Sequence, residues 1–279
     1  MEYIKIDNLQ LNNYKLKGAI LDKKRYGIYG KNHEDVIKLL KVLSGINNNH
    51  NTCTHNSKNI FDDKEFFKNR VHFDFSLNLF PTVDAKTIKE DLNFRYNIAF
   101  NEKLYKRLVN ELDVRNEIKV TNKYEFTPHG ITLNMFSILA SIEKQNVVIT
   151  NPLINISKNS KTIRHKIINT LCDNNKYNCV LIDASDLYDV IHYVDYLIVL
   201  GDYEEVFIID PLNDMFIISD DYVMLKNKIF KKDNIVISLD KYSKEEYREL
   251  KKTIKHKTVN FIEAYSYYTG EKYEKDNKK

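Results

Sequence analysis

The chain has 279 residues, 43% of them hydrophobic, and its 43 basic and 39 acidic side chains leave a formal charge of +4. This composition excludes disorder and predicts one large domain or two small ones. The charges are dispersed, so we expect no nucleic-acid partner.

The cysteines, the N-terminal residues and the lack of long apolar segments bear on metal binding and on the location of the protein in the cell. The three cysteines, Cys53, Cys172 and Cys179, fit neither a disulfide framework nor a zinc site, and no histidine has companions at metal-ligand spacing, so we expect no metal site. The opening residues, MEYIKIDNLQL, lack the pattern of a signal peptide, so we expect none, and the sequence has no apolar run of about 18 residues. We therefore expect a cytoplasmic protein that reaches a membrane only through a partner.

Short apolar or alternating segments predict strands along most of the chain. In order, they are 3–6, 19–21, 26–29, 71–75, 147–149, 180–182, 196–200, 206–209 and 235–239. The Asn-rich segment 47–57 predicts a loop. The pattern of strand, helix and strand around 147–182 favours a parallel sheet.

Helical spacing fills most of the intervals between these strands. One helix carries Val36 and Leu43 on a single face and ends near Gly45; the others cover 84–92, 102–112, 132–142, 164–171, 244–255 and 260–268. These patterns divide the chain into an α/β core (1–81 and 143–211), a helical insert (82–142) and a C-terminal extension (212–279).

The stretch from Tyr26 to Ile46 has the strand, glycine-bearing turn and helix of a phosphate-binding loop. Such a loop has the sequence G-x-x-x-x-G-K-[ST], whereas this chain places Asp35, Val36 and Ile37 at its last three positions. The frame of a nucleotide site is present, but its lysine and hydroxyl are not.

Further segments occur in the order and spacing of a known family. They are FDFSLNLFP at 73–81, TPHGI at 127–131, VVITNP at 147–152, VLIDASDL at 180–187 and NFIEAYSYYTG at 260–270. Together with the stretch at 26–46, they resemble the ATP-binding subunit of an ABC transporter, most closely the branch that exports drugs, bacteriocins and lantibiotics. The resemblance implies a P-loop NTPase (RecA-like) core of ABC type with an antiparallel edge sheet, a helical subdomain and a C-terminal extension.

The resemblance also assigns positions to the family's motifs, and most of them are degenerate. The nucleotide-binding positions of Walker A are Gly27, Gly30, Asn32, Val36 and Ile37; the signature is Thr127, Pro128, His129, Gly130 and Ile131; Walker B is Thr150 and Asn151; the switch position is Ser185. Because Walker A lacks its lysine and Walker B its acids, we expect no catalysis and no ATP or magnesium cofactor.

An aromatic cluster follows the strand at 71–75. In the family, this region receives the membrane-spanning protein, so Phe73, Phe75, Leu79 and Phe80 are candidate docking residues. Core packing is the alternative interpretation, and the sequence favours neither.

These observations lead to one principal hypothesis, a non-catalytic subunit of a membrane export complex. It would lie at the cytoplasmic face and bind an integral membrane permease, and it would pair with an active ATPase subunit or with itself. One alternative is a soluble adaptor or immunity protein that reuses the fold, and cytosolic partners would favour it. Another is an ATP-binding subunit with an atypical site, which predicts measurable binding of Mg·ATP.

Overall fold

We describe the protein from a computed structural model. The structure describes residues 2–11, 14–16, 19–30, 32–46, 52–120, 124–143, 146–173, 177, 179–200, 206–219, 235–238, 245, 248, 252 and 256–264. Contacts divide the chain into a first unit, Met1–Phe207, and a second unit, Ile208–Lys279, and each is described by itself.

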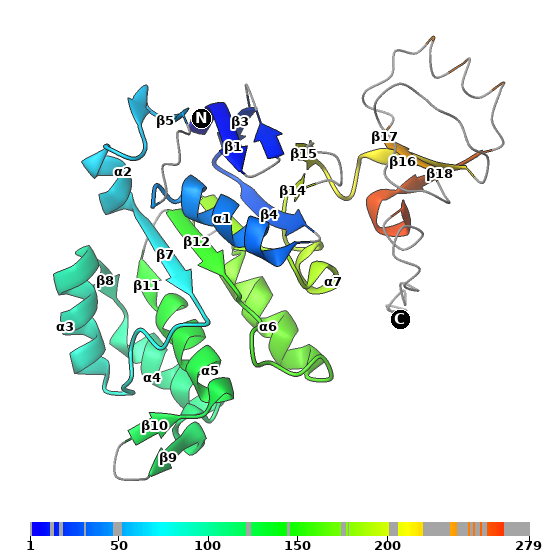
Figure 1. Ribbon diagram of the computed structural model, residues 1–279. Coiled ribbons are helices and arrows are strands. Elements are labelled where there is room, and N and C mark those ends of the chain that lie inside the picture. Colours follow the sequence, from blue (N-terminus) through cyan, green and yellow to red (C-terminus); the bar gives the residue numbers. More distant parts are fainter. Residues whose placement is uncertain are drawn as a thin grey trace. The chain divides into compact units, whose positions relative to one another are not determined.

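A six-stranded sheet with the order β15-β14-β4-β13-β12-β7 forms the core of the first unit (Figure 1). Its strands are β4 (Arg25–Gly30), β7 (Arg70–Asp74), β12 (Asn146–Thr150), β13 (Cys179–Asp183), β14 (Tyr196–Leu200) and β15 (Val206–Ile209). Neighbouring strands from β7 to β14 pair in parallel. Both faces of such strands are covered, so β12 and β13 are apolar runs that are buried throughout.

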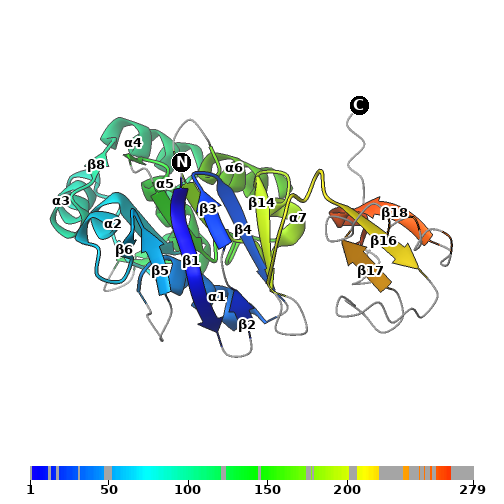
Figure 2. The same cartoon turned by 90° about the horizontal axis from the view of Figure 1, so that it is seen from above.

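Helices cover the core sheet on both sides. The helix α1 (His33–Leu43) packs on β4, β12 and β13 and also contacts β1. The helix α6 (Lys161–Leu171) connects β12 to β13 and lies on the other side of the core strands (Figure 2), and the short α7 (Leu187–Val190) packs against it. These elements confirm the α/β core and the predicted crossover helix.

An antiparallel edge sheet lies beyond α1. It is made of β1 (Glu2–Leu11), β2 (Tyr14–Leu16), β3 (Ala19–Asp22), β5 (Thr52–His55) and β6 (Lys58–Asn59). The edge sheet was expected, but the loop predicted at 47–57 is wrong in part. β5 pairs with β1, with Lys5 opposite Thr54 and Ile6 opposite Cys53. This short polar segment therefore forms a strand because it pairs with β1, and not because of its own sequence pattern.

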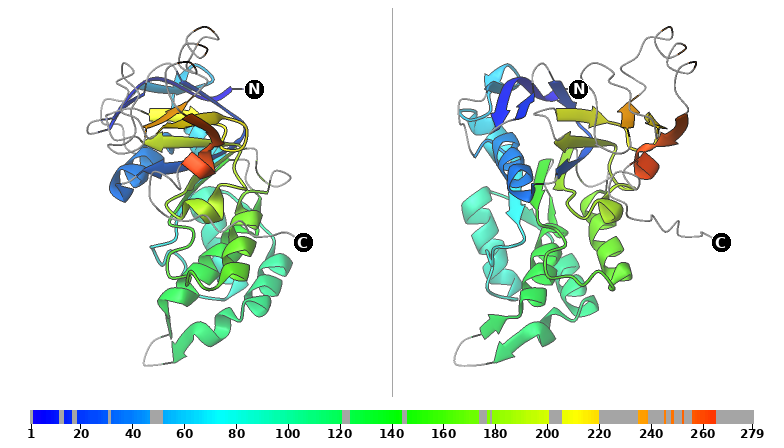
Figure 3. Two further views of the ribbon diagram at one scale, coloured as in Figure 1. Left: turned by 90° about the vertical axis from the view of Figure 1, so that its right-hand side faces the viewer. Right: turned by 45° about the vertical axis from the view of Figure 1, so that its right-hand side comes forward.

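The helical insert extends to the end of the first unit opposite this edge sheet (Figure 3). It contains α3 (Ala85–Tyr96), α4 (Glu102–Glu111) and α5 (Pro128–Leu139), with a 3₁₀ turn at Val114–Glu117. Asp84 caps α3 as predicted, because its carboxylate accepts the Thr87 amide. The small strands β8 (Ala99–Phe100), β9 (Ile118–Val120), β10 (Tyr124–Phe126) and β11 (Ile142–Glu143) were not predicted.

One further helix precedes the strand β7 in the first unit. α2 (Lys64–Asn69) leads into β7, and Asp63 caps it by accepting the Glu65 amide. Among the described residues, no helix combines the length and apolar character needed to cross a bilayer.

The second unit contains a three-stranded antiparallel sheet with the order β17-β16-β18. Its strands are β16 (Met215–Ser219), β17 (Ile235–Ser238) and β18 (His256–Asn260). Only β17 was predicted. Residues 261–264 are helical, whereas most of the helix expected at 244–255 lies outside the described residues. The sequence-based domain boundaries at 81, 142 and 211 stay predictions.

Candidate functional site

Four core strands end side by side and define a carboxyl edge of the sheet. The last residues of β4, β13, β12 and β7 are Gly30, Asp183, Thr150 and Asp74. Ligands of open parallel sheets bind outside this edge, where loops and helix N-termini converge. Of the predicted positions, Gly30, Asn32, Thr150, Asn151 and Ser185 lie at this edge or just beyond it.

The turn between β4 and α1 is short, because α1 begins at His33. The Asn32 side chain accepts the amide of Glu34 at 3.0 Å, and the Asn32 carbonyl accepts the amides of Asp35 and Val36 at 3.1 and 3.4 Å. The first-turn amides that would wrap a phosphate in a longer loop therefore already have partners within the chain.

The two predicted glycines are also required by packing. A Cβ on Gly27 would lie 2.7 Å from Cδ2 of Leu197, and one on Gly30 would lie 3.0 Å from the Cβ of Leu200. β4 lies directly beside β14 in the sheet, so both glycines allow a close approach to buried side chains. Their presence does not by itself indicate a phosphate contact.

The next positions of the predicted loop lie on α1. Val36 is fully buried and Ile37 is partly buried, so neither offers a polar group to the edge. Two acidic residues of the first turn lie near a lysine of the same helix: Nζ of Lys38 lies 4.0 Å from Glu34 and 3.8 Å from Asp35. Lys38 thus faces these two acids.

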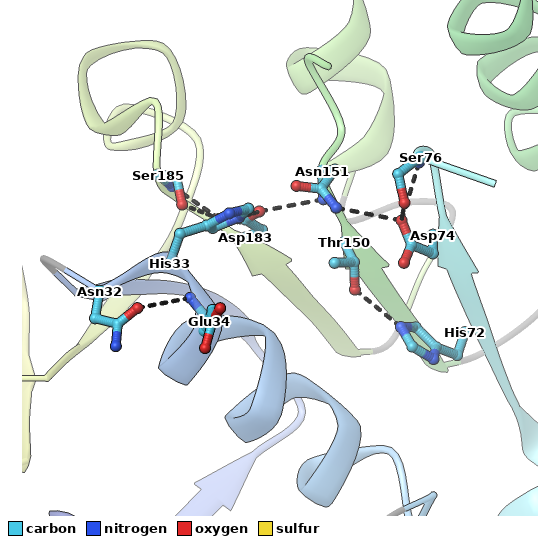
Figure 4. A network of polar contacts seen from close by, with 10 residues as sticks. All are labelled: Asn32, His33, Glu34, His72, Asp74, Ser76, Thr150, Asn151, Asp183 and Ser185. Atoms are coloured by element: carbon cyan, nitrogen blue, oxygen red, sulfur yellow. Dashed lines mark hydrogen bonds and ion pairs between the residues drawn. The ribbon is translucent and has the colours of Figure 1, made fainter.

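A chain of polar contacts crosses the carboxyl edge (Figure 4). His33 Nε2 donates to Asp183 Oδ2 at 2.8 Å, and the same oxygen accepts the Asn151 amide at 3.2 Å. The Asn151 side chain donates to Asp74 at 3.2 Å. Residues from α1, β13, β12 and β7 are therefore linked at one place, although they are far apart in sequence.

Asp183 is the centre of this network, and the sequence analysis did not identify it. Its Oδ1 accepts both the amide and the hydroxyl of Ser185, at 2.9 and 2.6 Å. With the two donors on Oδ2, this carboxylate is well satisfied although it is only 3% exposed. An aspartate at the end of an apolar strand was the signal that could have found it.

The predicted Walker B residues, Thr150 and Asn151, and the predicted switch residue, Ser185, lie at the same edge of the sheet, but each has different neighbours. Thr150 is buried, and its hydroxyl hydrogen-bonds Nε2 of His72 at 2.9 Å. Burial, together with the charge of Arg70, lowers the pKa of His72 to about 4, so this ring is neutral at pH 7. Asn151 has a φ of 54°, a left-handed conformation that asparagine tolerates better than most residues. Ser185 is exposed.

The predicted signature residues lie at the start of α5, in the helical insert. Thr127 caps the helix by accepting the Gly130 amide, and its hydroxyl donates to Glu117. A Cβ on Gly130 would lie 2.5 Å from the Cβ of Glu117, so glycine is needed there. Exposed Pro128 begins the helix, His129 contacts the carbonyl of Asn155, and Ile131 is partly buried. These hydrogen bonds do not reach the network of Figure 4.

The candidate docking residues are mostly internal. Phe73, Phe75 and Phe80 are at most 2% exposed, and the rings of Phe73 and Phe80 stack at 6.1 Å. Only Leu79 is partly exposed. This burial favours core packing for the three aromatic residues, and docking of a partner through them stays a prediction.

The polar groups at the edge fit a phosphate-bearing ligand through side chains rather than through a wrapping loop. Asn32 and His33 are exposed and Asn151 is partly exposed, and all three carry N–H donors. Among the described residues, no three His, Cys, Asp or Glu side chains are grouped as a metal site. That finding leaves open a magnesium ion bound with a nucleotide, because Mg²⁺ takes many of its ligands from phosphates and water.

No protein-family model matches the chain, and no curated protein matches it by sequence. Solved structures do share its fold. A cobalt transport ATP-binding protein, cbiO-2, is 13% identical over 84% of this chain and 92% of its own, with a TM-score of 0.56. An ATP-binding subunit of an ABC transporter is 11% identical over 96% of this chain and 99% of its own, with a TM-score of 0.51. The chain therefore has the P-loop NTPase fold of ABC ATP-binding subunits.

Two expectations from the sequence are corrected by this finding. We expected a chain that is not an enzyme and that takes neither ATP nor magnesium. The proteins that share its fold are ATP-binding subunits, members of a class of ATPases, and this contradicts both expectations. The inference failed because it treated each missing motif residue as a lost function, without regard to polar groups that other elements bring to the same edge.

Proposed function

We propose that this chain is the ATP-binding subunit of an ABC-type membrane transport complex. The observation that carries the proposal is the fold, a parallel core sheet with an antiparallel edge sheet and a helical insert, which matches an ATP-binding subunit of an ABC transporter over 96% of this chain and 99% of the other. A bound nucleotide would supply the free energy of phosphate hydrolysis, and the chain would place it at the carboxyl edge of the sheet.

The partner is an integral membrane permease, and the chain acts at the cytoplasmic face through it. The related subunit is described as part of an ABC transporter, which supports a membrane partner. A second ATP-binding subunit, either a copy of this chain or a different one, completes the pair. The exporter branch is supported by the segment at 260–270.

The motif assignments belong to the same proposal, and they make the site atypical. With Val36 and Ile37 in Walker A, no lysine or hydroxyl of α1 contacts the phosphates. Asn151 and Ser185 stand where the family has a glutamate and a histidine. The groups left to hold the nucleotide are the exposed donors of the edge, among them Asn32 and Asn151.

Calorimetric titration of the full chain with Mg·ATP tests the proposed binding of a nucleotide. We expect saturable heat for Mg·ATP and for Mg·ADP, and less for Mg·AMP, because the contacts go to the β- and γ-phosphates. No heat at millimolar Mg·ATP would contradict the proposal.

Co-purification tests the proposed binding to an integral membrane permease. A tagged chain expressed in its native host and extracted with detergent is expected to retain one integral membrane protein at a fixed ratio. Recovery of the chain from the cytosol alone, with no membrane protein bound, would instead favour an adaptor.

A further inference from the structure

We propose that His33, held in place by Asp183, is the side chain that contacts the phosphates of a bound nucleotide in place of the missing lysine. This inference rests on the proposed function, because it concerns the same carboxyl edge. It assigns a binding role to a residue that the family's motif does not use.

The geometry leaves one face of the imidazole for a ligand. Nε2 of His33 donates to Asp183 at 2.8 Å, while the His33 side chain as a whole is 44% exposed. Among the described residues, no hydrogen bond engages Nδ1. The buried carboxylate therefore holds the ring in position through the contact drawn in Figure 4, while part of the side chain remains exposed to solvent.

Other groups near α1 are less suited to this role. The amides of Glu34, Asp35 and Val36 are taken by Asn32, so the helix end itself does not provide the site. Lys38 lies against Glu34 and Asp35. His33 is thus the side chain on the first turn that can present a positive charge to the edge.

Most of the charged groups around His33 are acidic. The Asp183 carboxylate is in direct contact with it, and Asp74 lies further along the same network through Asn151. On α1, the charges of Glu34 and Asp35 are balanced in part by Lys38. A bound triphosphate would add further negative charge beside this imidazole.

Calorimetry with Mg·ATP at pH 6 and pH 8 tests the assignment in the full chain. We expect wild type to bind more tightly at pH 6. His33→Gln is expected to weaken binding at pH 6 by about tenfold, the usual effect of losing one charge-assisted contact, and to remove the pH dependence. His33→Lys carries a permanent charge, so it should keep the affinity and lose the pH dependence.

The control variant is His165→Gln, an exposed histidine that contacts Tyr193 on another part of the first unit. It should retain both the affinity and the pH dependence of wild type. Asp183→Asn tests the positioning role: it should weaken binding of Mg·ATP at pH 6 in the wild-type background and have little further effect in the His33→Gln background, which a purely structural role would not produce.

The outcomes separate this inference from the proposed function. If wild type binds Mg·ATP and His33→Gln binds equally well with the same pH dependence, the inference is wrong and the proposed function stands. If Asp183→Asn binds more tightly, Asp183 repels the ligand and the assignment is overturned. If wild type binds no nucleotide at either pH, both are wrong.

Discussion

At the scale of residues, an ion pair at the amino end of β4 shows how one charge stabilises the core. Asp195 contacts the Arg25 guanidinium at 2.7 and 3.1 Å and also accepts the Arg25 amide. Burial raises the pKa of Asp195, but the hydrogen bonds and charge of Arg25 outweigh it, so the pKa is lowered overall. The pair joins β4 to the residue just before β14.

This lowered pKa predicts a pH-dependent contribution to stability. A carboxyl group whose pKa is lower in the folded state stabilises it above the unfolded pKa of about 4, and that stability is lost as pH falls through the folded value. We therefore expect Asp195→Asn to unfold at lower urea concentration than wild type at pH 7, with a difference that shrinks below about pH 4. Asp62→Asn, at an exposed position, is the control. A difference that stays constant with pH would contradict this account.

At the scale of elements, one buried asparagine joins the helical insert to the core. Asn134 of α5 accepts the Tyr105 hydroxyl of α4 at 2.8 Å and donates to the carbonyls of Phe80 and Thr82 at 3.0 and 3.2 Å. It is 1% exposed. The segment that leaves β7 is thereby fixed to two helices of the insert.

Replacing this side chain by an apolar one of similar size removes three hydrogen bonds, and it leaves the buried Tyr105 hydroxyl without its acceptor. We expect Asn134→Leu to lower the free energy of unfolding by about 3 kcal/mol, measured by urea denaturation. Tyr105→Phe removes one of those hydrogen bonds and should cost less. In the double variant, the loss should be smaller than the sum of the two single losses, because the orphaned hydroxyl is then absent. Strict additivity would show that the two side chains do not interact.

The elements that the sequence predicted well are those whose pattern is set by burial alone. β12 and β13 carry short apolar runs rich in Val and Ile, and both strands are buried throughout. β5 and β18 are short and polar, and they become strands only by pairing with β1 and β16. No local pattern marks such segments, since the stabilising contacts come from distant residues.

The sequence predicted a candidate site at the glycine-bearing turn after β4, and this turn lies at the carboxyl edge of the sheet. That a ligand binds there stays a prediction. The contact between His33 and Asp183 joins residues that are 150 positions apart, and it depends on β13 lying beside β4. Strand order is set by long-range pairing, so a motif comparison could register the missing lysine but not the pair that the fold creates beside it.

At the scale of the whole molecule, the division into two units predicts that the first folds without the second. The first unit ends at Phe207, within β15, which extends to Ile209. A fragment of residues 1–210 keeps the core sheet, the edge sheet, the helical insert and every residue of the network in Figure 4. We expect it to unfold cooperatively in urea and to bind Mg·ATP with the affinity of the full chain.

A fragment that ends at residue 195 is the matched negative control, because it also removes β14. That strand pairs with β4 from Tyr196–Tyr26 to Leu200–Gly30, so its loss leaves β4 as an edge strand. Gly27 and Gly30 would then no longer face Leu197 and Leu200, and apolar surface would be exposed. We expect this shorter fragment to aggregate or to lack a cooperative transition by circular dichroism. If the 1–210 fragment also lacked one, the second unit would be needed for the core to fold, and the two units would form a single cooperative domain.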